Sequence, residues 1–109
     1  MSTIRKVCTK DASEERNIAI DLRGKLEVDE LLIGTPTVEE ITTSDLSLSN
    51  EAVSSSELTI EDDLVPVGQA VQFKVTGGVA GKRYKIRVTV NTNANPAQTL
   101  IENIKLRVI

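Results

Sequence analysis

The chain has 109 residues, with 13 Lys and Arg against 16 Asp and Glu, a formal net charge of −3 and no histidine. This length fits one domain, and the acidic balance argues against a dedicated binder of nucleic acid or of membranes. The lack of histidine removes Ser-His-Asp and Cys-His catalytic groups and most zinc sites. We therefore expect a protein that is not an enzyme and that needs no cofactor.

The first 15 residues are mostly polar and contain the single cysteine, Cys8. They include no apolar stretch of the signal-peptide kind, and no segment of the chain is long and apolar enough to span a bilayer, so we expect synthesis in a cytoplasm. Cys8 has no internal partner, so we expect a small apolar role, with an intermolecular disulfide as the alternative. We expect residues 1–15 to form an N-terminal arm or a first strand, with 11–16 as a candidate helical turn.

Alternating apolar and polar residues recur through residues 16–109 and predict short β-strands. In chain order, the expected strands carry Ile18, Ile20 and Leu22; the segment Lys25–Ile33, broken by Gly34-Thr35-Pro36; Leu46, Leu48 and Val53; Leu58 and Ile60; Val71, Phe73 and Val75; Tyr84, Ile86, Val88 and Val90; and Ile104, Leu106 and Val108. Residues 38–42 are a second, poorer helical candidate. About seven short antiparallel strands separated by turns are typical of a two-sheet β-sandwich.

A glycine-rich corner, Gly77-Gly78-Val79-Ala80-Gly81, separates two of these strands, and Tyr84 follows it. No helix is expected after the glycines, so they do not fit a phosphate-binding loop. A tyrosine just after such a corner is typical of immunoglobulin-like sandwiches, where its hydroxyl bonds to nearby backbone. We therefore expect Gly77, Gly78, Gly81 and Tyr84 to form a structural corner, and residues 16–109 to form an immunoglobulin-like β-sandwich.

Basic residues follow the corner at Lys82, Arg83, Lys85 and Arg87. They predict either a charged solvent face or an interface with an acidic surface of a neighbouring subunit, such as Glu61–Asp63. Contact with a nucleic-acid backbone is a further alternative.

Three asparagines, Asn91, Asn93 and Asn95, lie in the clearest loop of the chain, where asparagine suits turn positions with positive φ. A contact made by the loop tip is the alternative, so these asparagines join the basic residues as candidate interface positions. The acidic clusters Glu39-Glu40 and Glu61–Asp63 predict solvated turns or edges, with weak Ca²⁺ binding by the second cluster as an alternative.

Several short motifs occur in a fixed order along the chain. They are Lys10-Asp11, Ile20-Asp21, then Leu26, Asp29 and Ile33, the Gly-Gly-x-Ala-Gly-x-x-Tyr corner of Gly77–Tyr84, and the final Leu106-Arg107-Val108. In this series the chain resembles a family of small virion proteins of phages and prophages with an immunoglobulin-like β-sandwich. The corner is the most specific part of the resemblance.

The resemblance implies a non-enzymatic virion structural protein, an accessory subunit on the capsid, the neck or the tail. It implies assembly in the cytoplasm of a host bacterium, other phage structural proteins as partners, a homo-oligomer, and no contact with nucleic acid or membranes. A stand-alone immunoglobulin-like binding or adhesion module is the alternative. A small enzyme or metal-dependent regulator is a third, with less in the sequence to favour it.

Overall fold

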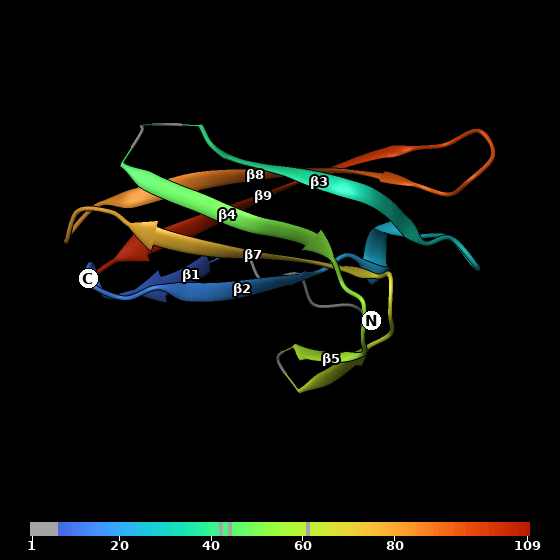
Figure 1. Ribbon diagram of the computed structural model, residues 1–109, viewed down its shortest axis with the longest axis horizontal. Coiled ribbons are helices and arrows are strands. Elements are labelled where there is room, and N and C mark those ends of the chain that lie inside the picture. The colour runs from blue at the N-terminus through green and yellow to red at the C-terminus, as the bar shows by residue number, and fades with distance from the viewer. Residues whose placement is uncertain (1–6, 42, 44, 61) are drawn as a thin grey trace.

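The regular structure of the described residues is strand, apart from one short 3-10 turn, which confirms the all-β class. The computed structural model describes residues 7–41, 43, 45–60 and 62–109, with side chains from Lys10 onward (Figure 1). Its elements are β1 (Val7–Lys10), β2 (Arg16–Asp21), the 3-10 turn η1 (Arg23–Lys25), β3 (Leu32–Glu40), β4 (Leu46–Val53), β5 (Leu58–Ile60), β6 (Asp63–Val65), β7 (Ala70–Gly77), β8 (Arg83–Thr92) and β9 (Thr99–Val108).

The strands form two main sheets and one separate hairpin. The first sheet has the order β1-β9-β8-β3, the second has the order β2-β7-β4, and β5 pairs only with β6. Every strand pair is antiparallel except β1–β9, which is parallel and aligns Val7 with Lys105 and Lys10 with Val108. The described residues thus hold nine strands where the pattern predicts about seven, because β1 joins the first sheet and β6 pairs with the expected strand at Leu58–Ile60.

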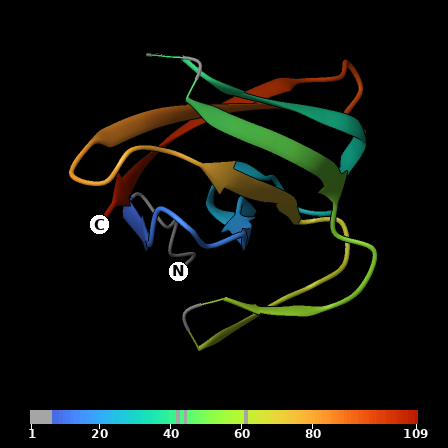
Figure 2. The same ribbon diagram turned by 60° about the vertical axis from the view of Figure 1, so that its left-hand side comes forward.

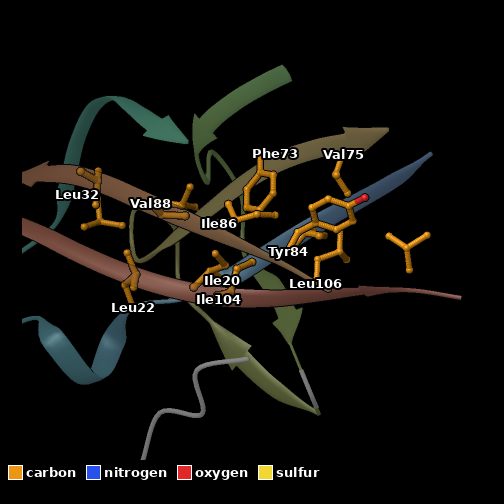
Figure 3. Packing of buried hydrophobic residues seen from close by; sticks show 14 residues of the cluster. Ile20, Leu22, Leu32, Phe73, Val75, Tyr84, Ile86, Val88, Ile104 and Leu106 are labelled. Carbon is orange, nitrogen blue, oxygen red and sulfur yellow. The ribbon is translucent and has the colours of Figure 1, made fainter. Parts of the chain in front are cut away.

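The core lies between the two main sheets and is built from their inward-facing residues. It contains Ile18, Ile20 and Leu22, then Leu32, then Val71, Phe73 and Val75, then Tyr84, Ile86, Val88 and Val90, and finally Ile104, Leu106 and Val108. Figure 3 shows the two aromatic rings, Phe73 and Tyr84, within this otherwise aliphatic cluster. Since side chains alternate between the two faces of a strand, the intervening residues of β8 and β9 point outward.

The segment before β3 departs from the strand expected over Lys25–Ile33. The Asp21 carboxylate accepts the Arg23 backbone N–H at 2.9 Å, which starts the short turn η1 instead. Strand β3 begins only at Leu32 and then continues through Gly34-Thr35-Pro36, where a break was expected. Its pairing with β8 shifts register between Ile33 and Thr37, and a proline is tolerated at such a bulge because no ladder hydrogen bond is required of it.

Neither helical candidate forms in the described residues. Residues 11–14 make a turn in which the Asp11 carboxylate accepts the backbone N–H and the hydroxyl of Ser13 at 2.9 and 2.8 Å. Most of the second candidate, residues 38–42, belongs to β3, which runs to Glu40. Residues 1–6 of the expected arm, together with Thr42, Ser44 and Glu61, lie outside the described residues, as does the Cys8 side chain.

The β5–β6 hairpin is a third layer on the outside of the β2-β7-β4 sheet (Figure 2). Ile60 and Val65 of the hairpin pack with Ala70 and with Ala19, which points away from the main core because Ile18 and Ile20 point into it. The Arg23 Nη1 atom also donates to the Leu64 carbonyl at 2.9 Å. These contacts fix the hairpin to the body of the protein. Within the described part of the chain, no helix has the length and apolarity needed to cross a bilayer.

Candidate docking face

Tyr84 links the glycine corner to the core and to the start of β4. Its ring is buried, and its hydroxyl accepts the Val79 N–H at 2.8 Å and donates to Asp45 Oδ2 at 3.0 Å. Burial raises the pKa of the Tyr84 phenol; the Val79 amide opposes this rise, and the Asp45 carboxylate adds to it. The corner is therefore held by a neutral phenol that bonds on both sides.

The glycines of the corner adopt a backbone conformation that other residues rarely adopt. Gly78 has φ +99°, and a Cβ atom there would meet Val108 Cγ2 at 2.9 Å and Leu46 Cδ2 at 3.1 Å. Gly81 has φ +87° with open space around it, so it is constrained by its backbone alone. The corner carries the chain from β7 in one sheet to β8 in the other, and it sets which residues of β8 face inward.

Three of the predicted interface residues lie on the outer face of β8. Because Tyr84, Ile86 and Val88 are buried, the alternating residues Arg83, Lys85 and Arg87 point away from the core, with Arg83 and Lys85 exposed and Arg87 half-buried.

Strand β9 adds two further cations to the same face. In the β8–β9 register Arg83 lies directly opposite Arg107, Lys85 opposite Lys105, and Arg87 opposite Asn103. Lys105 and Arg107 are exposed, between the buried residues Ile104, Leu106 and Val108. We name this surface the basic face: Arg83, Lys85, Arg87, Lys105 and Arg107.

The basic face is not neutralised by the rest of the described chain. None of its five cations forms an ion pair with a described residue, and Glu39 is the one acidic residue aligned with it, opposite Arg87. The buried Nε atom of Arg87 also has no hydrogen-bond partner among the described residues. Like charges placed directly across a strand pair are destabilising, so the arrangement costs stability in the isolated chain.

A hollow of about 300 Å³ lies at the edge of the basic face, lined by Arg83, Lys105, Leu106 and Arg107. Most of its lining surface is apolar, but its three charged lining residues are cationic and can bind carboxylate or phosphate oxygens. Arginine suits such contacts because its planar guanidinium donates two parallel hydrogen bonds.

The other predicted interface residues lie elsewhere. Lys82 approaches Asp45 at 3.8 Å beside the corner. Asn91 shares the outer face of β8 but lies at its far end, where its side chain accepts the Thr99 hydroxyl at 2.9 Å. Asn93 accepts the Leu31 N–H at 2.8 Å, and Asn95 precedes Pro96 in a cis peptide.

The expectation that these asparagines occupy positive-φ turn positions is wrong. The described non-glycine residues with positive φ are Asp29, Asn50 and Asp62. Asn93 instead joins two loops by a side-chain hydrogen bond, and Asn91 lies within β8 and not in the loop.

Two residues of the other short motifs, Lys10 and Asp21, are buried and make bonds within the fold. Lys10 is buried, and its Nζ donates to the Asp11 and Ala12 carbonyls at 2.7 and 3.3 Å. Asp21 is buried and forms an ion pair with Arg23 at 2.7 Å. Among the described residues, no group of three or more Asp, Glu and Cys side chains is arranged to hold a metal ion.

The model of one protein family, described as "Podophage GP4 fiber-tail adaptor protein gp77", matches residues 10–107 of the chain. The chain belongs to this family. Membership of the gp77 family makes it a phage virion protein of the tail-associated structural class, and the match gives no support to a position on the capsid or in the neck. No curated protein and no solved structure gives a significant match.

Proposed function

We propose that this chain is a non-enzymatic adaptor that connects a fibre to the tail of a podophage. The observation that carries the proposal is the family match, which covers residues 10–107 and whose description names a fibre–tail adaptor. A family of structural tail proteins also favours a role without catalysis. In this reading the other phage structural proteins of the tail are the partners.

The proposed architecture is an immunoglobulin-like sandwich formed by residues 16–109, with residues 1–15 as an arm that contributes Val7–Lys10 to a sheet. The corner supports it, because a tyrosine hydroxyl that bonds a nearby backbone amide is a feature of such sandwiches. The parallel strand β1 beside β9 supports the arm, because the segment is joined to the body by an edge-strand pairing.

The proposed docking site is the basic face. It supplies five cations without a described counter-ion, and a partner with an acidic surface would relieve their mutual repulsion. Charge complementarity at an interface speeds association and discriminates against wrong partners. An adaptor needs both properties, because it must select its neighbours among many virion proteins.

The proposal is tested on particles of a phage that encodes this chain. Mass spectrometry of purified virions is expected to find the protein, and gold-labelled antibodies are expected to mark the tail at the fibre attachment points. Particles made without the gene are expected to lack fibres while retaining filled heads. Absence of the protein from purified virions, or label confined to the head, would overturn the proposed function.

A further inference from the structure

The charge of this chain is divided between two surfaces. The whole chain has 13 Lys and Arg against 16 Asp and Glu, so without the five cations of the basic face 8 basic residues remain against 16 acidic ones. A chain with a net charge of −3 therefore presents one strongly cationic face on an otherwise acidic body. A second copy of the same chain offers an acidic surface to that face.

The β5–β6 hairpin is the best candidate for this acidic surface. Residues 57–65 contain four acidic residues and no basic one. Glu57 and Asp62 are exposed and form no ion pair with a described residue, whereas Asp63 lies 3.7 Å from Arg23. Leu64 of the hairpin is 60% exposed and so is available for an apolar contact.

The hairpin and the basic face lie on opposite sides of the protein. The hairpin covers the outside of the β2-β7-β4 sheet through Ile60 and Val65, whereas the basic face is the outside of the other sheet (Figure 2). Since the hairpin is fixed at Ala19 and at the Leu64 carbonyl, it cannot reach the basic face of its own chain. Contact between the two surfaces must join two chains.

We propose that the basic face receives the β5–β6 hairpin of a second copy of this chain. Glu57 and Asp62 lie against the cations of β8 and β9, and Leu64 packs on Ile101, which is half exposed on the same outer face. This inference rests on the docking role proposed for the basic face. Because the two surfaces differ, the contact is head-to-tail, and it closes into a ring when the rotation between copies allows it.

The composition favours a protein occupant over single-stranded nucleic acid. Nucleic-acid binders of single strands use exposed aromatic residues for base stacking, and both aromatic residues here, Phe73 and Tyr84, are buried in the core. Ile101, which is half exposed on the same outer face, also offers a phosphate backbone no hydrogen bond.

Self-association is tested by sedimentation velocity of the purified full chain over a range of concentrations and salt. Association is expected to weaken strongly with added salt, because the screening length falls from about 10 Å at 0.1 M to about 3 Å at 1 M. Two variants address the two surfaces. Lys85→Glu with Lys105→Glu alters the basic face, and Glu57→Lys with Asp62→Asn alters the hairpin; asparagine suits the positive φ of Asp62.

Each double variant alone is expected to sediment as a monomer. An equimolar mixture of the two is expected to form dimers and nothing larger, because only one intact hairpin and one intact basic face can meet in each pair. A charge-matched control, Arg16→Glu with Lys74→Glu on the other sheet, is expected to associate at least as well as the unchanged chain.

Three results would overturn the proposal. The first is a chain that stays monomeric at every concentration at low salt, and the second is a pair of mixed variants that fail to form dimers. The third is binding of a duplex DNA oligonucleotide to the unchanged chain that is lost in the Lys85→Glu, Lys105→Glu variant. None of these results removes the protein from the tail, so failure of this contact is distinguishable from failure of the adaptor role, which the virion experiments test.

Discussion

Lys85 on β8 lies directly opposite Lys105 on β9, with both side chains exposed on the outer face of the sheet. Arg83 and Arg107 form a second such pair two residues away. Opposed like charges weaken a strand pair, and no described acidic residue pairs with these four. This repulsion does not stabilise the isolated chain. We therefore interpret it as a feature of a surface that binds a partner.

Removing one charge of the Lys85–Lys105 pair should stabilise the isolated protein. Lys105→Thr is expected to raise the free energy of unfolding by about 0.2–1 kcal/mol, because it removes the repulsion and places a good strand former on β9. Urea unfolding at low salt measures the gain, which should shrink as salt is added. The control Lys74→Thr removes the 3.3 Å ion pair with Glu15 and should bring no gain. A loss of stability in Lys105→Thr would contradict the account.

The corner hydrogen bonds should contribute measurably to stability. Tyr84→Phe removes the acceptor of the Val79 N–H and the donor to Asp45, and we expect a loss of about 1–2 kcal/mol. A double-mutant cycle with Asp45→Ala isolates the Tyr84–Asp45 part of that loss. Unchanged unfolding of Tyr84→Phe would show that the phenol hydroxyl does not hold the corner.

The two glycines Gly78 and Gly81 should respond differently to alanine. At Gly81 only the positive φ opposes a side chain, so Gly81→Ala is expected to cost about 1–2 kcal/mol. Gly78→Ala should cost more, because its Cβ would also lie 2.9 Å from Val108 Cγ2. Thermal unfolding of the two variants shows which one loses more stability. An equal loss of stability would mean that the core around Gly78 adjusts to a Cβ atom without cost.

The alternating sequence pattern predicts the buried residues of this fold well. The alternation identified the buried residues of β2, β7, β8 and β9, and it placed Arg83, Lys85 and Arg87 on the outward side of β8. These features are local, since they depend on period and turn chemistry within one strand.

Features that depend on pairing between distant segments were not predicted. Nothing near Asp45 in the sequence relates it to Tyr84, 39 residues away. The role of Lys105 and Arg107 had a signal, because they alternate with Ile104, Leu106 and Val108, but their place beside Arg83 and Lys85 depends on the β8–β9 register. The parallel pairing of β1 likewise depends on where the C-terminal strand lies.

Acid should destabilise the protein in part through Glu30, a buried carboxylate two residues before β3. The Thr92 hydroxyl, and then the Glu27 amide, hold the pKa of Glu30 below its usual value. A group whose pKa is lower in the folded state contributes stability above its unfolded pKa, and that contribution disappears as pH falls through the folded pKa. Urea unfolding between about pH 7 and pH 3 should therefore show less acid sensitivity in Glu30→Gln than in the unchanged chain. An identical pH profile in both would contradict this role.

The central claim is that the basic face holds this protein in the virion. The direct measurement is the amount of the Lys85→Glu, Lys105→Glu variant in purified particles, by quantitative mass spectrometry, beside the Arg16→Glu, Lys74→Glu control. The variant should be depleted at least about tenfold, which corresponds to about 1.4 kcal/mol of lost docking energy, while the control is incorporated normally. Both chains must unfold cooperatively on their own for the comparison to count. Incorporation of the folded Lys85→Glu, Lys105→Glu variant at the level of the unchanged protein would contradict the claim.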